Sequence, residues 1–180
     1  MNVTIANLTL RSLQADDSPQ LLSLIARNRQ RLLDYFPVTS TAVTTLSAAY
    51  KFVDDKLAAE RRREHFTFVL EDAEQQLQGL FFLKNIDWRI PKAELAYFID
   101  AELCGRGIMT EALGAVCRHC FSAMGFIKLF IITSVDNIPS RRIAEKNGFE
   151  AEGVLRKNFR INSGVLVDNV YYGKLNTALL

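Results

Sequence analysis

Apolar residues along the chain follow two periods, and the period predicts which segments are strands and which are helices. Strands are expected where apolar positions alternate or run together, at 8–13, 65–70, 77–86, 93–100, 128–134, 149–160 and 165–175. Helices are expected where they recur every three or four residues, in two pieces between 16 and 37, and at 44–63, 109–124 and 139–147. The order indicates one mixed sheet in a single α/β (α+β) domain spanning 1–180.

Two of the expected helices show which face is buried. In the helix at 44–63, the apolar side is Leu46, Tyr50, Val53 and Leu57, at spacings of four, three and four. The helix at 109–124 has the clearest face, and Gly125 is expected to end it. Its apolar residues are Met109, Ala112, Leu113, Val116, Cys117, Cys120, Phe121 and Met124.

Cys117 and Cys120 spell C-x-x-C, a spacing shared by metal and redox sites. A zinc ribbon would need a second cysteine pair, and a redox motif would follow a strand, whereas this pair lies in the middle of a helix. We therefore expect core cysteines and no metal.

Composition narrows the class of protein. With 180 residues, 49% of them apolar, the chain can bury a core without a disulfide. It has no apolar run near ~18 residues and no signal-peptide pattern, so we expect a cytoplasmic protein without a membrane partner. The net charge of +2 is far from that of a nucleic-acid binder. Arg27, Arg29 and Arg31, and the arginine run 61–63, are expected on a solvated face, with an anionic partner as the alternative.

The loop from Cys104 to Thr110 is the segment most typical of a binding site. It places Gly105 and Gly107 directly before a helix, where unpaired N–H groups can bind a phosphate. A Walker loop would need Lys-Ser/Thr after the glycines, and a dinucleotide loop would need a third glycine at position 110. Neither pattern is present. The pyrophosphate loop of coenzyme A-dependent acyltransferases is the third alternative.

The rest of the chain favours that third alternative through a resemblance. Residues 105–112 resemble the G-x-G-x-M-x-E-A loop of the GNAT N-acetyltransferase superfamily. Residues 137–140 and 144–153 resemble its N-x-x-S and N-G-F-x-x-E-G segments, in the same order. Residues 10–13 and 28–37 resemble the opening of the bacterial ribosomal-protein N-terminal (Rim-type) branch. The match covers nearly the whole chain, and its two central motifs together are specific.

The resemblance implies a fold and a set of ligand-binding residues. The sheet would be mixed, mostly antiparallel, twisted and flanked by helices, and it would splay between the strands 92–100 and 128–134. The pantetheine arm of acetyl-CoA would lie in the splay and pair with the backbone near Tyr97–Ile99, with Phe98 and Ile99 as binding residues, and Asn137 would hold the same arm. The pyrophosphate would be cradled by Cys104, Gly105, Arg106, Gly107, Ile108, Met109 and Thr110.

Ser140 is the first of two expected catalytic residues. The resemblance places it beside the thioester sulfur, in the first turn of a helix, where its hydroxyl and the helix N-terminus both favour developing negative charge. The structural alternatives are helix capping for Ser140 and a turn for Asn137.

Two positions depart from the family pattern. Cys104 stands where Arg or Gln is usual, in a loop that works mainly through backbone N–H groups. Phe159 stands where the ribosomal-protein branch has a Glu proposed as general base, and phenylalanine takes no proton. Glu94 is the next candidate base, acting on the amine through water, with a salt-bridged strand residue as the alternative reading.

Loss of a base points to an acceptor that needs little deprotonation. Near pH 7 about one α-amine in seven is neutral, against about one lysine in 2,500. We therefore expect acetyl-CoA-dependent N-acetyl transfer to the N-terminal α-amine of a protein, with ribosomal proteins as candidates.

Other functions and contacts stay open at this stage. A small amine acceptor, such as a polyamine or an aminoglycoside, would need acidic lining, for which Asp54, Asp55 and Asp87 are the candidates. A non-catalytic acetyl-CoA-binding module is the other alternative. Trp88 is either a lid or substrate contact, or a residue with a surface-anchoring or interface role. The resembled branch often dimerises, so a homodimer stays open.

Overall fold

The computed structural model describes residues 1–177. Its eight strands form a single sheet in the order β1-β2-β3-β4-β5-β6-β8-β7. The strands are β1 (Asn2–Ile5), β2 (Leu8–Ser12), β3 (Phe66–Glu71), β4 (Leu77–Asp87), β5 (Lys92–Ile99), β6 (Lys128–Ser134), β7 (Glu150–Arg160) and β8 (Leu166–Leu175). The helices are α1 (Ser18–Leu32), α2 (Pro37–Ala42), α3 (Leu46–Arg61), α4 (Ile108–Ser122) and α5 (Ile138–Lys146).

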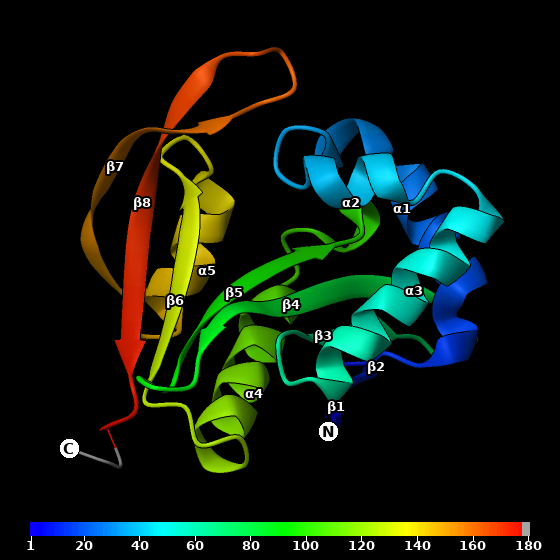
Figure 1. Ribbon diagram of the computed structural model, residues 1–180, viewed down its shortest axis with the longest axis horizontal. Coiled ribbons are helices and arrows are strands. Elements are labelled where there is room, and N and C mark those ends of the chain that lie inside the picture. Colours follow the sequence, from blue (N-terminus) through cyan, green and yellow to red (C-terminus); the bar gives the residue numbers. More distant parts are fainter. Residues whose placement is uncertain (178–180) are drawn as a thin grey trace.

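All neighbouring strands are antiparallel except β5 and β6, which run parallel. These two pair over a short stretch only, from Lys92 opposite Lys128 to Glu94 opposite Phe130. Beyond Glu94 they diverge, so that β6, β8 and β7 stand apart from the β1–β5 half of the sheet (Figure 1). The mixed, mostly antiparallel sheet with a central splay is confirmed.

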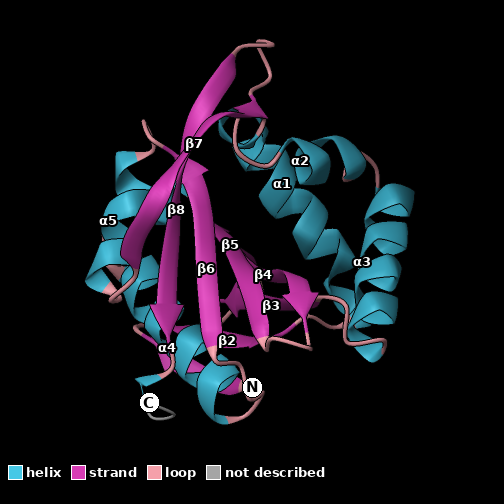
Figure 2. Ribbon diagram, turned by 60° about the vertical axis from the view of Figure 1, so that its left-hand side comes forward, coloured by secondary structure: helices cyan, strands magenta, loops and turns pink. Residues whose placement is uncertain are grey.

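Helices cover both faces of the sheet, and each face has its own core. One core joins α4 to residues from β1 to β8, and the other joins α1 and α3 to β3, β4 and β5. Figure 2 shows α1, α2 and α3 together on one side, with α4 and α5 on the other. Of the helices within residues 1–177, none is both long and apolar enough to cross a membrane.

Most of the elements expected from the periodicity are present, with two differences near the N-terminus. Strand β1 was not expected, because its four residues include two polar ones and it is too short to show a period. The two helical pieces expected before Pro37 are one helix, α1, and the second piece begins at Pro37 itself. Proline suits a helix start because its fixed φ is helical and its missing N–H has no helical partner there.

The buried face expected for α3 is wrong for two of its four residues. Leu46 and Tyr50 are 45% and 47% exposed, whereas Ala49 and Phe52 are buried beside Val53. Apolar residues of α3 lie on most sides of the helix. Their spacing alone is therefore compatible with the expected buried face and also with the observed one, which is turned by one residue. Contacts with α1 and β3 decide between the faces.

The cysteine pair of α4 lies in the core, as predicted. Cys117 and Cys120 are buried on the face that packs against the sheet, and burial raises the pKa of Cys117 to about 12. Burial raises the pKa of Cys120 as well. Gly125, with φ +78°, follows the end of α4 as expected. Within residues 1–177, no group of three His, Cys, Asp or Glu side chains is placed to hold a metal.

Candidate active site

A cavity of about 1020 Å³ opens where β5 and β6 diverge. Its walls also include the segment after α1, the start of α5 and the hairpin between β7 and β8. The expected site residues that line it are Glu94, Phe98, Ile99, Cys104, Gly105, Met109, Asn137 and Ser140, together with Phe159. Arg106, Gly107, Ile108 and Thr110 belong to the same loop and helix start but lie outside the lining. The splay thus brings most of the expected residues to one cavity.

The glycine loop has the conformation that an anion-binding turn requires. Gly105 and Gly107 both have φ +79°, and Gly107 is the N-cap of α4. A Cβ at either position would meet no atom within 4 Å, so backbone conformation rather than crowding calls for glycine here. The N–H groups of Ile108 and Met109 precede the first backbone hydrogen bonds of α4, which are the bonds from Thr110 and Glu111 to the Gly107 carbonyl.

Side chains of α1 fix the end of β5 just before this loop. Arg27 forms an ion pair with Asp100, and the Nδ2 of Asn28 donates to the same carboxylate at 3.0 Å. Arg31 donates to the carbonyl of Ile99 and to the Oδ1 of Asn28. The Nη1 of Arg31 also lies 3.6 Å from the Sγ of Cys104.

Arg27, Arg31 and the run 61–63 are exposed, in agreement with the expected solvated faces, but the arginines of α1 also make specific contacts with the protein. Arg29 is likewise engaged, because it donates to the carbonyls of Ser40 and Val43 and so fixes α2 to α1. An arginine's long side chain reaches backbone and carboxylate partners that its position on a helix does not show. The alternative of an anionic partner stays untested.

The backbone of β5 presents a row of groups to the splay. The N–H of Asp100 donates to the carbonyl of Gln78, the second residue of β4. The carbonyl of Ile99 points to the other side of β5, where it accepts from Arg31. Antiparallel pairing alternates the direction of backbone groups, so Leu95 and Tyr97 face the splay with Ile99, and Phe98 faces β4. Since Arg31 occupies the Ile99 carbonyl, this edge of the strand offers the backbone groups of Tyr97 and the N–H of Ile99.

Ser140 and Tyr97 meet across the splay. The Oγ of Ser140 donates to the hydroxyl of Tyr97 at 3.4 Å, and that hydroxyl donates to the Ser140 carbonyl at 3.2 Å. Burial raises the pKa of Tyr97, so its hydroxyl keeps its proton. Asn137 caps α5, and its Oδ1 accepts a hydrogen bond from the Ser140 N–H at 3.3 Å.

The Tyr97 side chain is a site residue that sequence reasoning missed, because only its backbone was considered. The available signal was its place on a strand that the resemblance put beside the cofactor. Strand alternation puts Tyr97 with Leu95 and Ile99 on the face covered by α4, where α5 also packs.

Glu94 is buried and lies on the opposite face of β5 from Tyr97. Its carboxylate contacts the Nζ of Lys84 at 3.1 Å and accepts a hydrogen bond from the Nδ2 of Asn85 at 2.6 Å. The structure therefore shows the salt-bridged strand residue that was the alternative reading. Because Glu94 also lines the cavity, it stays in reach of an acceptor there.

The other residues singled out from the sequence fall into two groups. Phe159 is half-buried and lines the cavity. An apolar ring therefore faces the acceptor region at the position where the ribosomal-protein branch has its proposed general base. Trp88 is a surface anchor, since it stacks on Phe126 with ring centroids 4.8 Å apart and its Nε1 donates to the Arg63 carbonyl. Trp88 lies outside the cavity lining, and so do the candidate acidic residues Asp54, Asp55 and Asp87.

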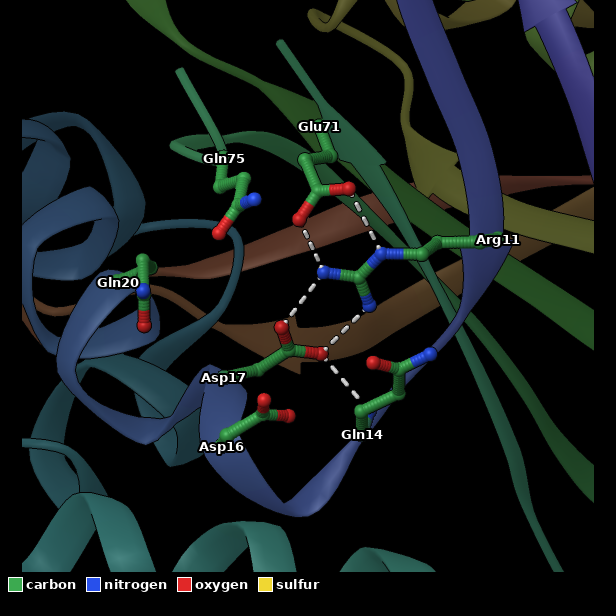
Figure 3. Close-up of a pocket in the computed structure, with 7 residues that line it drawn as sticks. All are labelled: Arg11, Gln14, Asp16, Asp17, Gln20, Glu71 and Gln75. Atoms are coloured by element: carbon green, nitrogen blue, oxygen red, sulfur yellow. Dashed lines mark hydrogen bonds and ion pairs between the residues drawn. The ribbon is translucent and has the colours of Figure 1, made fainter. Parts of the chain in front are cut away.

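A second hollow, of about 340 Å³, lies between β2, β3 and the turn before α1 (Figure 3). Its centre is the guanidinium of Arg11, clamped between the carboxylates of Asp17 and Glu71. Hydrogen bonds to Asp17 and Glu71 raise the pKa of Arg11. Five hydrogen bonds occupy the guanidinium, so it is left without a donor for a ligand. This cluster ties the N-terminal turn to the sheet.

Comparison with known proteins agrees with the geometry of the splay. Residues 7–150 match the family described as acetyltransferase (GNAT) domain. This chain belongs to the GNAT acetyltransferase family. It is an N-acetyltransferase, and the resemblance that its motifs indicated is confirmed.

Named relatives of this acetyltransferase include enzymes for two kinds of amine. YdaF of Bacillus subtilis (strain 168), provisionally named a ribosomal N-acetyltransferase, is 30% identical over 175 residues, 94% of this chain and 91% of that protein. A spermidine N(1)-acetyltransferase of Vibrio cholerae serotype O1 (strain ATCC 39315 / El Tor Inaba N16961) is 29% identical over 158 residues, 87% of each chain.

Solved structures show the same fold. The ribosomal-protein-S5-alanine acetyltransferase from Vibrio fischeri superposes with a TM-score of 0.92 at 23% identity, covering 98% of this chain and 97% of that one. RimL, a ribosomal L7/L12 alpha-N-protein acetyltransferase in complex with coenzyme A, superposes with a TM-score of 0.89 at 23% identity, covering 99% of each chain.

The charged lining of the acetyltransferase cavity is balanced rather than acidic. Its cations are Arg31, Lys56 and Lys84, and its carboxylates are Asp34, Glu94 and Asp136. Glu94, the buried carboxylate among the three, already has a cationic partner. Such a lining differs from the acidic surface that a polyamine, with several positive charges, would favour.

Proposed function

We propose that this acetyltransferase moves the acetyl group of acetyl-CoA to the N-terminal α-amine of a protein, with ribosomal proteins as the candidate acceptors. One observation carries the proposal: the cavity has Phe159 where a base would stand, and its buried carboxylate, Glu94, is tied to Lys84 and Asn85. A weakly basic site suits an α-amine, whose pKa of about 7.7–8.0 is far below that of lysine. The names of the ribosomal acetyltransferase relatives support the same acceptor.

The residues of the splay fit coenzyme A. The free N–H groups at the start of α4, with the two glycines before them, suit a pyrophosphate; this part of the site comprises Cys104, Gly105, Arg106, Gly107, Ile108, Met109 and Thr110. The unpaired edge of β5 from Leu95 to Ile99 suits the amide groups of pantetheine. Phe98 contributes a wall of the cavity, and Asn137 fixes the first turn of α5 beside it. Acetyl-CoA supplies an acetyl group already activated as a thioester.

Ser140 and Glu94 would divide the proton transfers between them. The amine nitrogen forms the new C–N bond as the C–S bond breaks, and the sulfur leaves with the electron pair of that bond. Ser140, backed by the Tyr97 hydroxyl, is placed to give the sulfur a proton. Glu94 lines the same cavity on the other face of the sheet and would take the proton of the amine through a chain of waters.

A peptide with a free N-terminal serine and one internal lysine tests the proposal. The purified protein is incubated with acetyl-CoA and this peptide, and in parallel with spermidine, and products are located by fragment mass spectrometry. We expect label on the α-amine alone. Label on lysine or on spermidine instead would overturn the α-amine acceptor. Binding of acetyl-CoA without any product would favour a non-catalytic binding module.

The remaining expectations from the sequence stay predictions. They are one domain spanning 1–180, a cytoplasmic location and the absence of nucleic-acid and membrane partners. Whether the protein forms a homodimer stays open.

A further inference from the structure

The closed end of the splay holds a group of side chains that the roles above do not use. Lys56 of α3, His65 just before β3, and Phe82 and Lys84 of β4 all line the cavity here. Lys84 lies opposite Glu94, which is the last residue of β5 that pairs with β6. The cluster therefore lies at the far end of the splay from the glycine loop.

Lys56 is the charged residue of this cluster that lacks a carboxylate. Its Nζ lies 5.2 Å from the ring centroid of Phe52 and 5.6 Å from that of Phe82. Among the ion pairs within residues 1–177, none includes Lys56. Burial and the nearby charge of Lys84 lower the pKa of Lys56, and the nearby charge of Asp55 offsets them only in part.

His65 beside it has an unused hydrogen-bonding atom. Its Nε2 is buried and has no hydrogen-bond partner, and its ring packs against Phe82 with centroids 5.6 Å apart. Burial, with the charges of Lys56 and Lys84, lowers the pKa of His65 to about 3. The imidazole is therefore neutral near pH 7, with one N–H donor to offer.

Of the three charged residues that line this end of the cavity within residues 1–177, Lys84 and Glu94 form an ion pair and Lys56 does not take part in it. Lys84 and Glu94 neutralise each other at 3.1 Å, so the carboxylate in this corner already has a partner and Lys56 has none there. We propose that this end of the cavity binds a carboxylate of the acceptor, with Lys56 as its charged partner and His65 and Lys84 beside it. A side-chain carboxylate would give Lys56 the ion-pair partner that it lacks among residues 1–177.

The position of the cluster says where in the acceptor that carboxylate lies, an inference that rests on the proposed α-amine acceptor. Glu94 and Tyr97 are three residues apart on β5, a distance of about 10 Å in a strand. An extended peptide covers about 7 Å from its first to its third residue, and a carboxylate side chain spans the remainder. An acceptor whose α-amine lies near Tyr97 and Ser140 would bring its second or third residue to Lys56. We therefore expect an acidic residue at one of these positions.

Equilibrium binding of two peptides to the coenzyme A-loaded protein tests this site. Each peptide has a free N-terminal serine, and the two differ only in carrying glutamate or glutamine at the second and third positions. Coenzyme A fills the cofactor site without allowing turnover, so binding is measured apart from chemistry. The variants are Lys56→Met, which keeps an unbranched chain against Phe52 and Phe82, and Lys51→Met. Lys51 is the matched control, because it lies on the same helix, is exposed and pairs with Asp55.

We expect the glutamate peptide to bind the wild-type protein about tenfold more tightly, the scale of one partly solvated charge-assisted hydrogen bond. Lys56→Met should bring both peptides to the same affinity, and Lys51→Met should keep the difference. Equal binding by the wild-type protein, or a difference that survives Lys56→Met, would overturn the proposal. Charge-dependent binding that is lost in Lys56→Met, with no acetylation when acetyl-CoA replaces coenzyme A, would support the carboxylate site and count against the proposed function alone.

Discussion

The hydroxyl of Tyr97 lies 3.4 Å from the hydroxyl of Ser140, joining the middle of β5 to the first turn of α5. The two side chains come from opposite sides of the splay, so their hydroxyls meet where the sheet has no backbone pairing. A leaving sulfur placed in the splay would therefore face two donors, one of which is held in its protonated form by burial.

Ser140→Ala should lower kcat by about a hundredfold, at the lower end of what a general acid contributes, because Tyr97 remains as a second donor. The affinity for acetyl-CoA should change little, since the serine hydroxyl is placed for the leaving group and not for the pyrophosphate. Steady-state kinetics together with acetyl-CoA titration separate the two effects. An unchanged kcat would show that Ser140 only packs the first turn of α5.

Tyr97→Phe should lower kcat by about tenfold and leave the peptide KM close to that of the wild-type protein, because the ring still packs on Phe81. Tyr172→Phe is the control, since that hydroxyl also bonds to its neighbours, Arg141 and Glu145, but lies outside the cavity lining. The control should lose stability, seen as a lower Tm, and keep its kcat. Equal losses of kcat in both variants would assign Tyr97 a purely structural role.

Glu94→Gln should lower kcat/KM near pH 7 by about tenfold, and the loss should shrink near pH 9. The physical reason is that an α-amine with a pKa of about 7.7–8.0 loses its own proton at the higher pH and no longer needs a base. Asp55→Asn is the control, because Asp55 is an exposed carboxylate that pairs with Lys51 and lies outside the cavity lining, so its kcat should stay near that of the wild type. A deficit in Glu94→Gln that is constant from pH 7 to about pH 9 would contradict a role in proton removal.

Asp100→Asn should lower stability by about 1–3 kcal/mol near pH 7, because Asp100 is buried and receives hydrogen bonds from Arg27 and Asn28. Burial alone would raise the pKa of Asp100, but the hydrogen bond from the Glu102 N–H and those from Arg27 and Asn28 outweigh it and lower the pKa.

The pH dependence of this effect follows from that direction. A depressed folded-state pKa contributes stability above the unfolded value of about 3.9, and the contribution is lost as the pH falls through the folded value. Urea unfolding at a series of pH values should therefore show the wild type and Asp100→Asn converging below about pH 4. A difference that stays constant through this range would contradict the assignment.

The sequence predicted the parts of the fold and site that depend on local signals. The glycines at 105 and 107, the helix start at Pro139 and the apolar face of α4 each depend on a few neighbouring residues, so the sequence alone locates them. The motif order then placed the splay between β5 and β6, which the register confirms.

Features that depend on distant contacts could not be predicted in this way. The approach of Tyr97 to Ser140 depends on how α5 packs, and the arginines of α1 find their partners at the end of β5. The face of α3 is likewise set by its neighbours, which bring Lys56 to the cavity and leave Leu46 exposed. Side-chain charge and spacing within one helix do not contain this information.

Gly107→Ala tests the glycine loop by conformation alone. An alanine at φ +79° costs about 1–2 kcal/mol, yet its Cβ would meet no atom within 4 Å, so steric clash does not contribute. If the loop relaxes toward negative φ, the N–H groups at the start of α4 turn away from the pyrophosphate. Acetyl-CoA should then bind about fivefold to thirtyfold more weakly, as that strain energy implies.

Gly153→Ala is the matched control for this change. A Cβ there also meets no atom within 4 Å, but the backbone of Gly153 lies outside the left-handed region. Isothermal titration with acetyl-CoA should give wild-type affinity for Gly153→Ala and the weakened value for Gly107→Ala. Equal affinities for the two variants would mean that the left-handed backbone at Gly107 does not shape the pyrophosphate site.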